Sequence, residues 1–452
     1  MLMNESIREL GADAPCTGPG ASRAVARGAT GGGEAFHHSM KRRCFVHDYK
    51  GRSIYLITLE VAGRQRLLGR ILGADAPGTG PGSALPEIPL SVSGLSEAEL
   101  SAINARLFEP SELGRRVAEE FMKICEHVPG VKPLLAQAMP DHFHGILFVT
   151  REINRTLGSI VAGFKGKCSQ LARELGVLEA LTRLSPDCGT DDLTRLTLGR
   201  TGCRSVKVSL WEEGFHDRIL TSDGQLEKMF RYVRDNPRRL ALRLKYPDLF
   251  TSVRCLAGHG HIFDAYGNGF LLQSDEIVQV QCSRRFFGFK REEKLGLTPN
   301  TPNRKVKVTH EVAFETPEFD AKKAELFAAA KKGAVLCSPC ISDGEKAIAY
   351  AAVDAGYSLI VLRNESFPPR FKPSGRFFDA CAEGRLLMLC PQRLMSHVPN
   401  GGDRQPAHIT RAECLALNAV VAEICGGNAG DVVYQGFPVS DLKEKCLWKP
   451  TV

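Results

Sequence analysis

The stretch LLAQAMPDHFHGILFV, residues 134–149, decides how the first half of this chain folds. It consists of two apolar runs that are interrupted by a Pro-Asp pair. Short apolar runs on either side of such a turn signal are typical of paired strands. We therefore predict a β-hairpin, in which His142 and His144 lie on one face of the second strand while Phe143 points into the core.

Predicted strands and helices alternate on either side of this hairpin. The run SIYLITLEV from Ser53 predicts a buried strand, and apolar residues at helical spacing over 113–124 predict a helix after it. Beyond the hairpin, an apolar stripe over 157–175 predicts a second helix, and SVKVSLW (205–211) predicts a fourth strand. This order is that of a ferredoxin-like βαββαβ sandwich, an α+β fold.

An extra helix follows the fourth strand. Its apolar residues recur over 226–233, and we expect it to end near Pro237, because proline interrupts helical hydrogen bonding. Tyr232 and Asn236 are spaced i and i+4, which places the phenol and the amide on the same side of the helix, one turn apart. They flank the apolar stripe, so both can face a site while the helix stays packed.

The pattern of predicted strands and helices changes from about residue 251. The segment GAVLCSPCISDGEKAIAYAAVDAGYSLIVL predicts a strand, a turn, a helix and another strand, which is the βαβ unit of a parallel sheet. We therefore expect a second α/β domain. The predicted division is a disordered leader (1–39), a first domain (40–250), a strand-rich connector (251–320) and the second domain (321–452).

Composition narrows the class of protein. The net charge of +8 favours polyanionic partners, and 15 cysteines without a dense framework fit a reducing compartment. The sequence contains no run of about 18 apolar residues, which a membrane-spanning helix needs. We expect a cytoplasmic protein without a membrane partner.

The pair His142 and His144 is a candidate metal site, because two imidazoles on one face of a strand can share an ion. A pair of surface histidines is the alternative. The chain repeats the pattern at His259 and His261, in a glycine-rich turn region with no helix downstream that offers partners. What distinguishes the first pair is the Tyr232 helix, so we favour the first pair as the functional one.

These residue types fit one kind of chemistry. A phosphodiester repels nucleophiles, so a divalent cation must neutralise its non-bridging oxygens before a tyrosine oxygen can attack. Two imidazoles and the Asn236 carbonyl would leave coordination positions open for phosphate oxygens and water. The set predicts attack on DNA by Tyr232, with Mg²⁺ or Mn²⁺ as the cofactor.

Four segments occur in order within residues 40–250: MPDHFHGILFV, TLGSIVAGFKGKCSQ, SLWEEGFHDRIL and MFRYVRDNPRR. Together they resemble the REP-associated and insertion-sequence tyrosine transposases of the HUH (His-hydrophobic-His) nuclease superfamily. The resemblance implies that His142 and His144 bind the metal. It also implies that Tyr232 is the nucleophile and Asn236 the third ligand. A tyrosine packed in the core is the alternative for Tyr232.

Basic residues surround the predicted nucleophile and lie along the second helix, as a surface that tracks phosphates should. A solvated helix face is the alternative for any one of them. The expected DNA-binding residues are Lys165, Lys167, Arg231, Arg234, Arg238 and Arg239.

The C-terminal segments GAVLCSPCISDGEKAIAYAAVDAG and FKPSGRFFDACAEGRLLMLCP resemble the Rossmann-like fold of DNA-processing protein A and the lonely-guy family. Ser338, Ser342, Gly344 and Glu345 lie where a strand meets a helix N-terminus, a place suited to a phosphate. Cys337 and Cys340 form a CxxC pair without a second pair to complete a zinc site, and we expect free thiols.

The combined expectation is a bacterial, cytoplasmic strand transferase. It would cleave single-stranded DNA beside a hairpin, form a 5′-phosphotyrosine at Tyr232 and rejoin the strand elsewhere, with a homodimer as one assembly that would fit. One rival is a hairpin-DNA-binding protein that has the fold without turnover. Another is a nucleotide-processing enzyme centred on the C-terminal domain.

Overall fold

The computed structural model describes residues 47–72, 87–178, 209–282, 287–298, 301–392 and 409–426. The chain divides into two compact units. Unit 1 comprises Met1–Pro86 and Leu95–Ala241, and unit 2 comprises Glu87–Gly94 and Leu242–Val452. Both units mix helices with sheets, which confirms the predicted α+β class in its coarse form. The predicted leader lies outside the described residues. No helix in the described ranges is long and apolar enough to cross a membrane.

Unit 1 is built on a four-stranded antiparallel sheet in the order β4-β5-β1-β6. The predicted hairpin at residues 134–149 is confirmed, because β4 and β5 pair with Met139 opposite His142. The predicted first strand is confirmed as β1. The strands are β1 (Ser53–Glu60), β4 (Val131–Met139), β5 (His142–Val149) and β6 (His216–Leu220).

The fourth strand lies later in the chain than expected. Of the predicted segment 205–211, only 209–211 is described, and there Trp211 makes a single isolated bridge to Val61. The strand that pairs with β1 is β6. It is an edge strand whose side chains are only partly buried, so its sequence HDRIL lacks the apolar run by which a buried strand is recognised.

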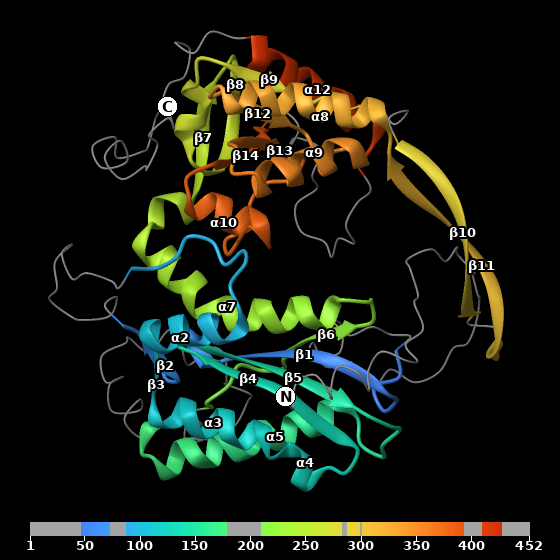
Figure 1. Ribbon diagram of the computed structural model, residues 1–452. Helices are drawn as coiled ribbons and strands as arrows, with labels where there is room; N and C mark the ends of the chain where they lie inside the picture. Colours follow the sequence, from blue (N-terminus) through green and yellow to red (C-terminus); the bar gives the residue numbers. More distant parts are fainter. Residues whose placement is uncertain are drawn as a thin grey trace, which may run out of the picture. The chain divides into compact units, whose positions relative to one another are not determined.

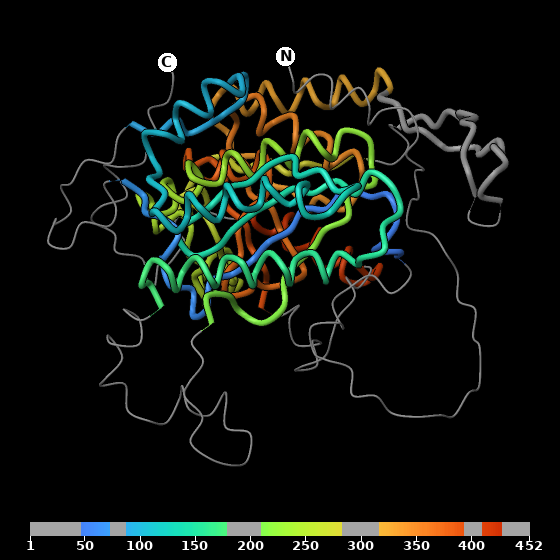
Figure 2. The backbone as a smooth tube through the Cα atoms, turned by 90° about the horizontal axis from the view of Figure 1, so that it is seen from below, coloured from blue at the N-terminus to red at the C-terminus, as the bar shows by residue number. Residues whose placement is uncertain are grey.

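Helices cover both faces of the sheet of unit 1 (Figure 1). Phe143 packs against Phe121 of α3 and Phe164 of α5, with ring centroids 5.1 and 5.5 Å apart. Figure 2 shows α3 and α5 running beside each other on this face. The opposite face, around Leu56 and Ile146, packs against α7. The helices are α2 (Glu97–Leu107), α3 (Glu112–Met122), α4 (Ile124–His127), α5 (Leu157–Glu174) and α7 (Gln225–Lys245).

The helix α7 does not end near Pro237, contrary to the prediction. It continues through the proline to Lys245. A proline inside a helix removes one backbone hydrogen bond, at a cost of about 3 kcal/mol. Burial beyond the proline offsets this cost, because Ala241 and Leu242 are fully buried. A bidentate ion pair between Asp235 and Arg238 also spans the proline.

Unit 2 contains a six-stranded sheet in the order β7-β8-β14-β13-β12-β9. The strands β9, β12, β13 and β14 are parallel, and β8 and β7 add an antiparallel edge. Three of these strands come from the predicted connector and join the same sheet as the predicted βαβ unit. They are β7 (Ser252–Gly258), β8 (His261–Gly267) and β9 (Ile277–Gln279); the others are β12 (Val335–Ser338), β13 (Leu359–Leu362) and β14 (Leu386–Pro391).

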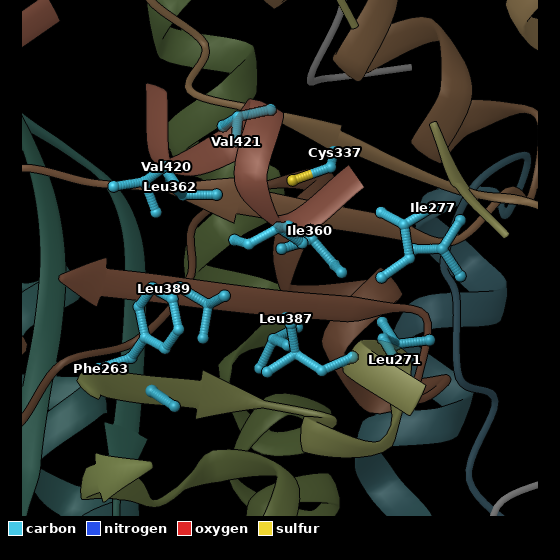
Figure 3. Packing of buried hydrophobic residues seen from close by; sticks show 14 of the residues in the cluster. Phe263, Leu271, Ile277, Cys337, Ile360, Leu362, Leu387, Leu389, Val420 and Val421 are labelled. Atoms are coloured by element: carbon cyan, nitrogen blue, oxygen red, sulfur yellow. The ribbon is translucent and has the colours of Figure 1, made fainter. Parts of the chain in front are cut away.

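Every residue of β12, β13 and β14 is buried, so both faces of these strands are covered. On one face, Cys337, Ile360 and Leu387 pack with Val420 and Val421 of α12 (Figure 3). The other helices contact the strands around them. They are α8 (Pro317–Lys331), α9 (Asp343–Asp354), α10 (Arg376–Ala382) and α12 (Arg411–Gly426). A separate antiparallel hairpin pairs β10 (Phe287–Thr298) with β11 (Thr301–Glu315).

Unit 1 has a close backbone contact that allows a test of its packing. A Cβ atom at Gly114 of α3 would lie 1.8 Å from the carbonyl oxygen of Leu68, whereas one at Gly163 of α5 would meet nothing within 4 Å. We expect Gly114→Ala to lower the free energy of unfolding of unit 1 by about 1–3 kcal/mol, because backbone must move. Gly163→Ala should leave stability unchanged or raise it by up to about 1 kcal/mol.

The measurement is urea unfolding in a Trp448→Phe background, in which Trp211 is the one remaining tryptophan of the two in the sequence. Equal effects of the two alanines would contradict the close contact.

Candidate active site

The two histidines of β5 lie together on the face of the sheet that α7 covers. His144 is only 6% exposed. The centroids of the His142 and His144 rings are 4.8 Å apart, with the rings nearly perpendicular. On the neighbouring strand, Thr58 stands opposite His144, and its Oγ1 is hydrogen-bonded to Nδ1 of that ring at 2.9 Å. The expected placement of the pair on one face is therefore observed.

A carboxylate fixes the second ring. Nδ1 of His142 donates to Oδ1 of Asp141 at 2.6 Å, and Arg64 donates to the other oxygen of that carboxylate at 3.3 Å. Arg64 also pairs with Glu60. Burial opposes ionisation of Asp141, but the hydrogen bond and charge of His142, together with Arg64, outweigh it and lower the pKa of Asp141 to about 2. With Nδ1 held in both rings, a metal would be bound through Nε2.

The helix α7 brings Tyr232 to the histidines. The centroids of Tyr232 and His144 are 6.2 Å apart in an edge-to-face arrangement. The ring also packs against the apolar cluster around Ile146 and Val233, so part of Tyr232 belongs to the core and part faces the site. The guanidinium of Arg239 lies 5.5 Å from the centre of the phenol ring. A cation therefore lies beside the ring of Tyr232.

Asn236 lies one turn further along α7 and is 8% exposed. Its Nδ2 atom is buried, and within the described residues it has no hydrogen-bond partner. A half-turn of the amide would bring the carbonyl oxygen to that position, where a cation could satisfy it. The described part of the chain holds no cluster of three His, Cys, Asp or Glu side chains suited to a metal.

Sequence reasoning missed a row of polar residues across the sheet. Gln137, His144, Thr58 and His216 stand at the same register on four adjacent strands, and their side chains therefore share one face. His216 is exposed on the edge strand. Thr58 and Gln137 had no signal in the sequence, because only the strand pairing brings them beside His144. His216 was missed because β6 itself was misplaced.

Three of the six predicted DNA-binding residues make interactions within the fold. Arg238 is fully buried against Asp235, and Arg234 pairs with Glu97 of α2. Lys165 donates to two backbone carbonyls of the loop at 212–214, and burial lowers its pKa. These interactions occupy the charges that were expected to meet phosphate. The prediction is therefore wrong for Arg238, which has no exposed surface.

Three of the predicted residues keep a surface or a place at the site. Arg231 is exposed and donates to the carbonyl of Leu95 at 3.5 Å. Arg239 is the residue over the Tyr232 ring. Lys167 is exposed, but it lines a cavity of about 340 Å³ between α4 and α5, on the face of the sheet opposite the histidines. Of these three residues, Arg231 and Arg239 lie on α7, the helix of the candidate nucleophile, and Lys167 does not.

The second His-x-His pair has a structural explanation. His259 and Gly260 form the two-residue turn between β7 and β8, with φ of 48° and 74°. Positive φ at both central residues is the type I′ geometry of tight hairpins. His261 pairs with Glu423 of α12. The turn region is thus as expected, but the expectation that no downstream helix offers a partner is wrong, because Glu423 of α12 pairs with His261.

The predicted phosphate position in unit 2 is occupied by the chain itself. Ser342 and Glu345 form a capping box at the start of α9, and the Glu345 carboxylate accepts from the backbone N–H groups of Ile341 and Ser342. An anion would have to displace this carboxylate. Cys337 and Cys340 are free thiols, as expected, and burial raises the pKa of both.

Comparison with known proteins adds no family. No protein-family model matches the chain, and the curated proteins contain no match to it.

The carboxylate beside His142 predicts a pH dependence of stability. The pKa of Asp141 is about 2 in the fold against an ordinary value of 3.8, so its ionised form stabilises unit 1 above about pH 4. This contribution, at most about 2 kcal/mol, is lost as the pH falls through 2. We expect Asp141→Asn to destabilise the metal-free protein at pH 6 and to have a much smaller effect near pH 2, where Asp141 is already half protonated.

The measurement is urea unfolding with a chelator present at each pH. Asp223→Asn is the control, because Asp223 is exposed and makes no hydrogen bond or ion pair with the described residues. A destabilisation by Asp141→Asn that is the same at both pH values would refute the assigned role of the carboxylate.

Proposed function

We propose that unit 1 is a metal-dependent DNA strand transferase of the transposase type, with Tyr232 as the nucleophile. The observation that carries the proposal is the contact of the Tyr232 ring with His144, at 6.2 Å between centroids, beside the second histidine of the same strand. A nucleophile, two imidazoles and a nearby arginine are the groups that attack on a phosphodiester needs.

The residues present fit a divalent cation. His142 and His144 would supply Nε2 atoms, and the Asn236 amide, which has a buried atom in need of a partner, would supply an oxygen. A bound Mg²⁺ or Mn²⁺ would neutralise the non-bridging oxygens of the phosphate. Asp141 and Thr58 orient the two rings through Nδ1, as the partners of metal-binding histidines commonly do.

The chain's own groups account for the transfer step. The Tyr232 oxygen forms a bond to phosphorus and loses its proton to solvent, while the bond from phosphorus to the 3′ oxygen breaks and that oxygen takes up a proton. The products are a 5′-phosphotyrosine and a free 3′-hydroxyl. Because the phosphotyrosine conserves a phosphodiester, a 3′-hydroxyl can reverse the step at another site without ATP.

The proposal includes the finer fold assignments and the family. The antiparallel order β4-β5-β1-β6, joined through α3 and α5, supports a ferredoxin-like sandwich for unit 1. The parallel strands of unit 2, with helices between them, support a Rossmann-like domain. With these folds, membership of the HUH tyrosine transposases is the identity that we propose, with hairpin-flanked single-stranded DNA as the substrate.

The nucleophile can be tested by a covalent adduct. The full chain is incubated with 5′- or 3′-labelled single-stranded DNA hairpins and Mn²⁺, then denatured and separated by electrophoresis. We expect an adduct that carries the label from one side of the cleavage only, and no adduct from Tyr232→Phe, because the variant lacks the attacking oxygen. Tyr246→Phe is the matched control and should form the adduct normally. An adduct formed by Tyr232→Phe would contradict the assignment of Tyr232 as the nucleophile.

The metal site can be tested without turnover. Mn²⁺ binding is measured by electron paramagnetic resonance on the full chain. We expect His142→Ala, His144→Ala and Asn236→Ala each to weaken binding by about 10-fold or more, because each removes one ligand. His261→Ala, from the other His-x-His pair, should bind as the unaltered chain does. If His261→Ala alone abolished binding, the metal would belong to the other pair.

The two rivals make different predictions in these assays. A hairpin-binding protein without turnover would retain labelled DNA in a native gel and give no adduct under any metal. A nucleotide-processing enzyme centred on unit 2 would keep its activity in Tyr232→Phe. The ring contact between Tyr232 and His144 favours strand transfer over both, because neither rival requires it.

A further inference from the structure

A row of three residues crosses the carboxyl end of the parallel strands of unit 2. Arg363 directly follows β13, and its backbone N–H donates to the Leu389 carbonyl of β14 at 2.8 Å. Continuing the register by one residue sets Arg363 beside Cys390, which is paired with Asp264 of β8. Burial raises the pKa of the Cys390 thiol to about 12, and the charges of Asp264 and Arg363 act on it in opposite directions. Both charges therefore lie close to this thiol.

The carboxylate of Asp264 has hydrogen-bond donors within the protein. Asp264 is 3% exposed, and it accepts hydrogen bonds from Ser366 on one oxygen and from Gln392 on the other, the latter at 3.0 Å. Both donors are neutral. Asp264 and Arg363 stand two strand spacings apart, which is about 10 Å between backbones. Asp264 thus forms no ion pair with Arg363.

The guanidinium of the row has no such partner. Its Cζ atom lies 5.2 Å from the centre of the Phe367 ring and 4.7 Å from that of Phe371. Nη1 of Arg363 is buried, and among the described residues no acceptor reaches it. Glu365 acts on Arg363 through its charge, but the two form no ion pair. Leaving a buried donor unsatisfied is unfavourable, so the guanidinium is placed to bind an acceptor from outside the described residues.

We propose that Arg363 anchors a binding site for a phosphate-bearing ligand at this end of the sheet. The planar fork of arginine matches the oxygens of a phosphate, and the two phenylalanine rings hold the fork in place. In open α/β sheets, ligands bind outside the carboxyl ends of the parallel strands, where Arg363 lies. The start of α9, the other place suited to an anion, is filled by the Glu345 carboxylate.

Either free phosphate or the phosphate of a nucleotide has this chemistry, and two titrations separate them. The full chain is titrated calorimetrically with inorganic phosphate and with thymidine 5′-monophosphate. We expect binding of at least one probe. Binding of both with equal affinity assigns the site to the phosphate group alone, and tighter binding of the nucleotide assigns it to a nucleotide.

Variants test the residue. Arg363→Gln should weaken binding by about 10- to 100-fold, the value of charge-assisted hydrogen bonds. Arg370→Gln removes the same charge from an exposed position on the same loop and should change the affinity for the probe by less than about 2-fold. If Arg363→Gln fails to fold in circular dichroism, Arg363→Lys replaces it. The lysine keeps the charge over the rings but lacks the fork, and should weaken binding by about 10-fold.

The proposal would be overturned if neither probe bound, or if the Arg363 variants bound the probe with unchanged affinity. It would also be overturned if Arg370→Gln weakened binding as much as Arg363→Gln does. The site does not rest on strand transfer by unit 1. Tyr232→Phe should bind the probe like the unaltered chain, so failure of one proposal leaves the other standing.

Discussion

The pairing of β5 with β1 is the constraint on which the candidate site depends. Thr58 can hold Nδ1 of His144 only in the register that sets these two residues opposite each other. A slip of one residue would turn both histidines to the other face. The apolar face prevents that slip, because Phe143 packs against two helices, and a Cβ at Gly145 would lie 2.3 Å from the Phe121 ring. The packed face thus fixes the polar one.

The continuity of α7 is the second requirement. A helix that ended at Pro237 would leave Asn236 in a frayed last turn. Because the helix continues, Tyr232 and Asn236 lie on one uninterrupted helix. They are one turn apart, about 6 Å along its axis. The ion pair of Arg238 with Asp235 helps to hold that region. Arg238, which was expected to bind DNA, therefore contributes to the geometry of the site.

The sequence allowed prediction of the features that depend on local pattern. The hairpin at 134–149 and the i, i+4 spacing on α7 follow from turn residues and periodicity. The edge strand β6 did not, because a half-exposed strand has no apolar run. The roles of the basic residues could not be predicted either. A lysine that donates to backbone carbonyls, such as Lys165, cannot be distinguished in the sequence from a lysine that binds phosphate.

Buried polar atoms without partners have different meanings in different side chains. Arg64 and Asn104 each have one such atom, but Arg64 donates through Nη1 and Asn104 donates through Nδ2, so their orientation is explained within the fold. Asn236 and Arg363 make no side-chain hydrogen bond with any described residue. Each such atom costs about 1–3 kcal/mol, and the described side chains of Trp211, Arg243 and Gln279 bear the same kind of cost. Under the two proposals above, a cation would relieve this cost at the amide of Asn236, and an anion would relieve it at the guanidinium of Arg363.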